Sequence, residues 1–258
     1  MHLFSKFANH CRTFLIAGFS ILFFQTSTSA ETLVGSNVDN RVLVGVDAPS
    51  KGVEALLPEG WELMPFPGGP LAGANVLLVF IDTLSQRDAE GQPIYPAARR
   101  ALALASLGKQ GDKVRLFVLR IYNTKPEPDP YGVNVVADVM RTTGVAVAAN
   151  DKRRRSDEWV IQTAENEKIT FVLDYETGNR NWAPAEALPY SATDPDFSRI
   201  YRVNQLTDLV VSKALEKPAS GTYSLTNSLS DLGTILDGSE DIVAVIDVPM
   251  YVREIFLP

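Results

Sequence analysis

Histidine and cysteine are almost absent from this 258-residue chain, which has two histidines and one cysteine. All three residues, His2, His10 and Cys11, lie within the first eleven positions. If that segment is removed, the remaining protein has no disulfide, no thiol nucleophile, no Ser-His-Asp triad, no histidine general base and no Cys/His zinc site. Its chemistry must then rest on carboxylates, lysine, arginine, tyrosine, hydroxyls and backbone amides.

The N-terminus has the pattern of a targeting segment. Two cations precede or border an apolar run at 14–24, and small residues lead up to Ala30. This order of charge, apolar run and small residues predicts a cleaved signal peptide over 1–30 and a mature domain at 31–258 that is periplasmic or secreted. An uncleaved membrane anchor is the alternative, but the run is short for a bilayer-spanning helix. After cleavage we expect no integral membrane span.

Basic residues are fewer than acidic ones, 24 against 31, which gives a formal net charge of −7. The first thirty residues hold two cations and no carboxylate, so cleavage would take this charge to −9. Nucleic-acid binding depends on neutralising phosphates with lysine and arginine, and an acidic chain argues against it. The sequence also lacks an Asp-rich loop that could hold calcium or magnesium. We therefore expect no nucleic-acid partner, no metal and no cofactor.

Apolar, β-branched segments bounded by turn-forming residues predict strands. The predicted strands are 41–46, 75–82, 114–122, 158–163, 168–175, 200–203 and 242–256. Helices are predicted, from capping and proline positions, at 50–58, from Pro96 to just before Gly108, and at 129–140. Because the strands do not alternate regularly with helices, the pattern predicts an α+β fold. We expect one domain with a large antiparallel or mixed sheet curled into a barrel-like core and a few flanking helices.

Three polar residues are candidates for function. Arg41 opens a predicted strand, Glu90 lies in a turn bounded by glycine and proline, and Lys152 begins the run "KRRR". Each has a plainer interpretation as a solvated surface charge. Lys152 attracts more interest, because a neighbouring cation and burial both disfavour its charged form, and an uncharged lysine can attack a ketone. It qualifies as a nucleophile only if the fold encloses it near Glu90 and Arg41.

Several stretches, taken with their order and spacing, resemble the acetoacetate decarboxylase family. They are Asn40-Arg41, "LLPEGWEL" at 56–63, "AEGQPIYP" at 89–96, Lys152-Arg153, "LDYETG" at 173–178 and the apolar C-terminal strand. The resemblance is diffuse but spans most of the chain after residue 30. It implies an α+β fold with a barrel-like β core.

The resemblance further implies a Schiff-base-forming lyase that decarboxylates a small β-keto acid. On this hypothesis Lys152 is the nucleophile, and Arg153 is the fixed cation that disfavours its protonation. Glu90 would be an acid/base or orienting carboxylate, and Arg41 would contact the substrate carboxylate. The iminium formed at the lysine would accept the electrons of the departing carboxylate. The second lysine of the family's pair is an arginine in this chain.

Two other interpretations of the same residues remain open. The chain could be a non-catalytic, exported binding protein of this fold that holds a small organic anion, since consecutive arginines bind carboxylates well. Alternatively, the stretch "DKRRRSDEW" at 151–159 could be an exposed loop that docks a protein partner or anionic lipid head groups. A small keto acid or another organic anion is the expected partner, and the sequence allows a homo-oligomer.

Overall fold

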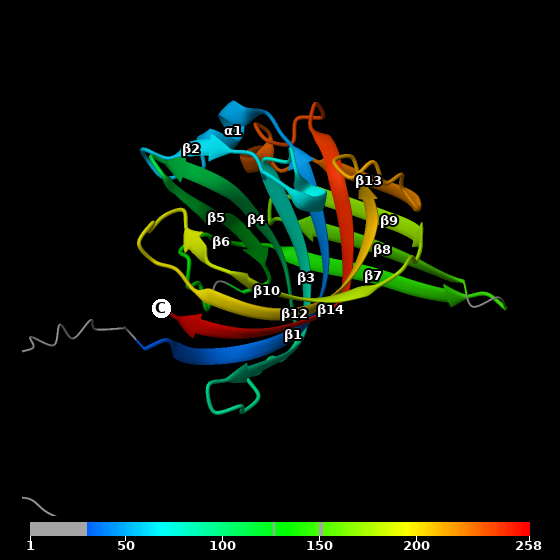
Figure 1. Cartoon of the computed structure of the whole chain (residues 1–258), viewed down its shortest axis with the longest axis horizontal. Coiled ribbons are helices and arrows are strands. Elements are labelled where there is room, and N and C mark those ends of the chain that lie inside the picture. The colour runs from blue at the N-terminus through cyan, green and yellow to red at the C-terminus, as the bar shows by residue number, and fades with distance from the viewer. Residues whose placement is uncertain (1–29, 126, 150–151) are drawn as a thin grey trace, which may run out of the picture. The chain divides into compact units, whose positions relative to one another are not determined.

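Strands dominate the chain, and the computed structural model describes them over residues 30–125, 127–149 and 152–258 (Figure 1). The larger of two sheets has the order β10-β12-β14-β1-β3-β4-β5-β11, with β2 paired to β4 and β6 to β5. Its strands are β1 (Thr32–Asp47), β2 (Glu62–Met64), β3 (Val76–Asp88), β4 (Arg99–Gln110), β5 (Lys113–Asn123), β6 (Asn134–Val136), β10 (Asn181–Ala187), β11 (Pro189–Ser191), β12 (Ile200–Ser212) and β14 (Asp241–Leu257).

The smaller sheet has four strands in the order β13-β9-β8-β7 and lies on the right in Figure 1. Its strands are β7 (Asp138–Val147), β8 (Arg153–Gln162), β9 (Lys168–Glu176) and β13 (Gly221–Asn227). Among the described residues, helical structure is limited to α1 (Ser50–Glu54) and two 3₁₀ turns, η1 (Gly69–Leu71) and η2 (Ser230–Leu232). No helix within the described part of the chain has the length and hydrophobicity needed to cross a membrane.

The large sheet is open but strongly curled. β10 and β11 stand at its opposite ends, yet only Leu188 separates them in sequence. Because one residue spans less than about 4 Å of chain, the two ends of the sheet must lie close together. β11 then pairs with β5 in parallel, whereas most other pairs are antiparallel. The curl encloses one face of the sheet and leaves the other face to pack on the small sheet.

Alternation along the strands separates these two faces. Val42 and Val44 of β1 are fully buried in the core between the sheets, where Phe80 of β3 meets the small sheet. The Phe80 ring centroid lies 5.0 Å from that of Phe171 and 5.6 Å from that of Trp159. Since neighbouring side chains on a strand point to opposite sides, the residues between these core positions face the inside of the curl.

The expected strands and the large mixed sheet are confirmed. The predicted helix at 50–58 is confirmed in part, because α1 covers only Ser50–Glu54 and its N-cap is Pro49. The sheet does not close into a barrel. Two predicted helices are wrong: the stretch before Gly108 is strand β4, and 129–140 contains β6 and the start of β7. In β4, leucine and alanine alternate with a period of two, which is the period of a strand. The predicted signal peptide lies outside the described residues.

Candidate functional site

The basic run that begins at Lys152 does not form one cluster. Arg155 is buried, whereas Arg153 and Arg154 are exposed. The Arg154 guanidinium contacts the carboxylate of Asp174 on the neighbouring strand. Because successive side chains of β8 point to opposite faces, Arg154 and Arg155 cannot hold one ligand together. The run therefore does not supply the anion site that its composition indicates.

Lys152 lies just before β8 on the outer surface of the small sheet. Its Nζ atom is 2.8 Å from Oε1 of Glu176, and its side chain is 60% exposed. A Schiff-base nucleophile of this kind needs an enclosed setting with little water around its amine. The enclosure on which the nucleophile hypothesis depends is thus absent around Lys152.

Glu90 and Arg41 lie in different settings again. Glu90 is exposed in the turn between β3 and β4, and Arg41 is buried on β1. Arg41 lines a cavity inside the curl of the large sheet, but Lys152 and Glu90 do not. The structure therefore does not bring the predicted site residues together, and only Arg41 lies where a ligand can be enclosed. Its contact with a substrate carboxylate stays a prediction.

The cavity has a volume of about 610 Å³ and is bounded by nearly every strand of the large sheet. Leu77, Val79 and Ile81 of β3 face it, and so do Ala101, Ala103 and Ala105 of β4 and Leu116 and Val118 of β5. The alanines of β4 alternate with Leu102 and Leu104, which point into the core between the sheets. Large residues thus fill the core, and small ones leave the cavity open. Its volume lies within the range of pockets that enclose small organic ligands.

The charged residues of the cavity wall all have one sign. Of the described residues that line it, Arg41, Arg87, Arg99, Arg199 and Arg253 carry positive charge, and none is an aspartate, a glutamate or a lysine. This composition contrasts with the acidic chain as a whole. A cavity with cationic side chains on an otherwise apolar wall is suited to an organic anion.

Arg41 is the one cavity arginine with a carboxylate partner in the described structure. Its Nε atom donates to Oδ2 of Asp39 at 2.9 Å, and its guanidinium stacks 3.5 Å from the ring centroid of Tyr251. Asp39 also accepts a hydrogen bond from Asn37 and is fully buried behind the wall. The charge of Arg41 is therefore largely neutralised by the protein itself.

Arg253 and Arg199 have no carboxylate partner among the described residues. The Nε atom of Arg253 donates to the neutral amide of Asn37 at 2.8 Å, and its guanidinium stacks on Tyr201. Burial by itself lowers the pKa of Arg253, but electrostatic interactions with Tyr201, Tyr251 and Asp39 raise it above its ordinary value. The Nε atom of Arg199 is buried without a hydrogen-bond partner. Both side chains remain cationic at the wall of the cavity.

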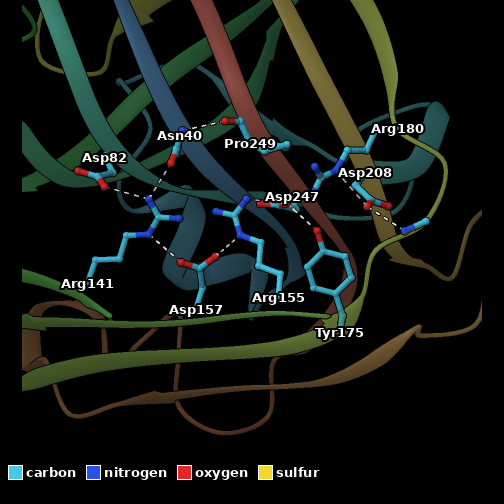
Figure 2. Close-up of polar contacts among 11 residues, drawn as sticks. Asn40, Asp82, Arg141, Arg155, Asp157, Tyr175, Arg180, Asp208, Asp247 and Pro249 are labelled. Atoms are coloured by element: carbon cyan, nitrogen blue, oxygen red, sulfur yellow. Dashed lines mark hydrogen bonds and ion pairs between the residues drawn. The ribbon is translucent and has the colours of Figure 1, made fainter. Parts of the chain in front are cut away.

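A second polar cluster lies between the two sheets, and Figure 2 shows its contacts. Arg141 of β7 donates to Asp157 at 2.7 Å and to Asp82 at 2.9 Å. Arg155 of β8 donates to Asp157 at 2.8 Å and to Asp247 of β14 at 3.0 Å. Because these bonds join the small sheet to β3 and β14, the cluster fixes the position of one sheet on the other.

Asp247 occupies the deepest part of this inter-sheet network. Its Oδ2 atom accepts hydrogen bonds from Arg155 and from the Tyr175 hydroxyl at 2.6 Å, while its Oδ1 atom is buried without a partner. Burial raises the pKa of Asp247, although Arg155 and Tyr175 act in the opposite direction. At the margin of the network, Arg180 lies 3.7 Å from the carboxylate of Asp208. Within the described residues, no group of three His, Cys, Asp or Glu side chains could hold a metal ion.

Sequence reasoning missed most of the cavity residues. Arg199, Arg253 and the tyrosines beside them come from separate strands and loops, so no local motif contains them. The only local signal is the alternation of leucine and alanine in β4, which indicates a strand with one large and one small face. The face of β4 with small side chains lines a cavity because the sheet curls around it. The sequence does not show this curl.

No sequence family matches the chain, and neither does any curated protein. Solved structures do match. The enduracididine biosynthesis enzyme MppR complexed with pyruvate superimposes with a TM-score of 0.55, at 11% identity, over 90% of this chain and 91% of that one. An acetoacetate decarboxylase-like enzyme from Sphingomonas wittichii RW1 has a TM-score of 0.52 and 12% identity, over 93% of this chain and 97% of its own. The protein therefore has the acetoacetate decarboxylase-like fold that its sequence predicts.

Proposed function

We propose that the protein binds a small organic anion non-covalently in the cavity of the large sheet and forms no Schiff base with it. The observation that carries this proposal is the composition of the wall, which has five arginines and, among its described residues, no lysine and no carboxylate. Cationic side chains supply affinity for the anion, and the apolar wall supplies affinity for its carbon skeleton. We also propose that residues 1–30 are a cleaved signal peptide, so that this binding takes place in the periplasm or outside the cell.

The charge balance of the cavity favours an anion over a neutral ligand. A guanidinium that faces a low-dielectric cavity without a counter-charge is costly, and an entering carboxylate removes much of that cost. Arg199 and Arg253 come nearest to this situation, because both line the cavity and neither has an ion pair with a described carboxylate, although Asp39 acts electrostatically on Arg253. A neutral ligand of the same shape would leave both charges uncompensated.

Ligand-dependent thermal stability tests the proposal. A panel of organic acids is compared with the corresponding neutral amides, and the melting temperature is measured by differential scanning fluorimetry. At a ligand concentration about 100 times Kd, the acid should stabilise the protein by about 2.7 kcal/mol. That corresponds to a rise of roughly 5 to 10 °C for a domain of this size. Lys152→Ala should show the same rise, and a panel in which no acid shifts the melting temperature contradicts the proposal.

A Schiff-base lyase is the second candidate, favoured by the likeness to the structure of MppR complexed with pyruvate. On that hypothesis Lys152 is the nucleophile, with Arg153 and Glu90 in the roles that the family resemblance implies. Borohydride reduction in the presence of a keto acid, followed by peptide mass analysis, distinguishes the two functions. An adduct on Lys152 supports the lyase. Binding without any adduct supports the non-covalent function.

A further inference from the structure

The cationic groups of the cavity are not equivalent. Arg41 already has the carboxylate of Asp39 at 2.9 Å, so an additional anion there would meet a compensated charge. Arg253 donates a hydrogen bond to the neutral amide of Asn37 and has no ion pair with a described carboxylate, and Arg199 has a buried Nε donor with no hydrogen-bond partner. Arg87 is exposed, and Arg99 has only the neutral amide of Asn123 at 3.5 Å. The excess positive charge of the cavity therefore lies at arginines other than Arg41, and Arg199 and Arg253 are the two that lie near tyrosines lining the cavity.

These two arginines converge on one pair of phenol groups. The Tyr131 and Tyr201 hydroxyls lie 2.6 Å apart, and both tyrosines line the cavity. Arg199 directly precedes β12 and lines the cavity two residues before Tyr201, and in an extended chain residues two apart lie on the same side. The Arg253 guanidinium also lies 4.1 Å from the Tyr201 ring centroid. Two cations and two hydroxyl groups thus surround one small region of the wall.

The rest of the cavity is apolar and much larger than one carboxylate. The inward faces of β3, β4 and β5 present leucine, valine, isoleucine and alanine side chains to it, and the cavity volume is about 610 Å³. A two- or three-carbon acid would leave most of this wall in contact with water. An acid with a larger carbon skeleton would remove the wall from water, which is favourable in proportion to the apolar area buried.

We propose that the ligand is a monocarboxylic acid with a long or ring-shaped apolar body. Its carboxylate lies between Arg199 and Arg253 beside the hydroxyls of Tyr131 and Tyr201, and its body lies along the alanines of β4. This assignment rests on the proposed function, because it names the ligand class and the head-group position within the same cavity. It places the main carboxylate contact away from Arg41.

Chain length tests the ligand class. Affinities of the purified protein for a series of straight-chain acids, from acetate to decanoate, are measured by isothermal titration calorimetry below the micelle concentration of each. Affinity should rise about fourfold for each added methylene, because each buried methylene contributes about 0.8 kcal/mol. Pyruvate should bind far more weakly than decanoate. Equal affinity for pyruvate and decanoate overturns the ligand class.

Substitution tests the position of the head group. Arg199→Met should weaken decanoate binding by about tenfold to one hundredfold, the loss expected for a hydrogen bond to a charged group. Arg199→Lys keeps the charge and should recover part of the affinity. Arg154→Met, which removes a positive charge from the outer surface of the small sheet, is the matched control and should leave affinity unchanged.

The outcomes separate this inference from the proposed function. If decanoate binds but Arg199→Met and Arg253→Met weaken it no more than Arg154→Met does, the head group lies elsewhere and the inference is overturned while the function stands. If no acid of any length binds, the proposed function itself fails. If decanamide binds as tightly as decanoate, the cavity recognises the apolar body alone and the carboxylate assignment is overturned.

Discussion

Arginine occurs in two contrasting settings in this protein. Between the sheets, Arg141, Arg155 and Arg180 each lie within ion-pair distance of an aspartate. At the wall of the cavity, Arg199 and Arg253 have no carboxylate partner among the described residues. A compensated arginine is a structural connection, because the fold already supplies its counter-charge. An arginine without an ion-pair partner has a charge that only a ligand or solvent can balance. The presence or absence of a nearby carboxylate therefore distinguishes a structural arginine from a binding arginine.

Replacing an arginine by methionine in each setting tests this comparison. We expect the larger change in the free energy of unfolding between the sheets. Arg155→Met removes the cation that joins Asp157 and Asp247, and both carboxylates are buried. Removing one partner of a buried ion pair costs about 3–5 kcal/mol. Urea denaturation followed by tryptophan fluorescence, to which the fully buried Trp159 contributes, should show a loss of this size in the free energy of unfolding.

Arg199→Met is the counterpart at the cavity wall. In the absence of ligand it should raise the free energy of unfolding by roughly 1 kcal/mol, because it eliminates a buried donor that has no partner. We therefore expect Arg155→Met to lower the free energy of unfolding and Arg199→Met to raise it. Destabilisation of similar size by Arg199→Met and Arg155→Met would show that the two settings do not differ, and the distinction based on charge balance would then be wrong.

The pH dependence of stability should expose Asp247 within the inter-sheet network. Its pKa is raised in the folded state, chiefly by burial. Between the unfolded and the folded pKa, the folded protein therefore binds more protons, and its stability falls as pH rises through that interval. The size of the loss is about 1.4 kcal/mol for each unit by which the pKa is raised.

Asp247→Asn isolates this contribution, because asparagine keeps the shape of the side chain and does not titrate. The urea midpoints of the wild type and the variant are compared from pH 4 upward. The contributions of the other carboxylates are the same in both proteins and cancel when one midpoint is subtracted from the other. The wild type should lose stability relative to the variant as the pH rises. A difference that stays constant, or that changes in favour of the wild type, contradicts the assignment of a raised pKa to Asp247.

The β-rich fold could be predicted from sequence because strand signals are local. Apolar alternation and turn residues identified seven of the fourteen described strands, and six stretches indicated the fold family. The stretch before Gly108 was misassigned because alanine and leucine are strong helix formers, and their preference conflicts with the period-two alternation of the same residues. Tertiary packing decided in favour of the strand, since leucine could fill the core on one side and alanine could border the cavity on the other.

The candidate site was predictable only in part, because its residues meet through the curl of the sheet. Arg41 was identified, but Arg199 and Arg253 were not, since nothing near them in sequence indicates that their charges are uncompensated. Lys152 was singled out because three arginines follow it. That argument assumed that the whole run faces one environment, whereas the strand sends Arg155 inward and leaves Lys152 paired with Glu176 at the surface.

Filling the cavity from β4 should separate ligand binding from stability with the smallest disturbance of the fold. Ala103 faces the cavity, so the ring of Ala103→Phe can lie in the cavity. The substitution should change the free energy of unfolding by less than about 1 kcal/mol, because it neither disturbs the packed core nor breaks a polar contact. Each methylene that the ring excludes should cost a long acid about 0.8 kcal/mol of affinity. Short acids should bind as they do in the wild type, because their carboxylate contacts at Arg199 and Arg253 are unchanged. Calorimetric affinities for butyrate and decanoate test this contrast, and the variant fails to support the cavity as the binding site if both acids retain their wild-type affinity.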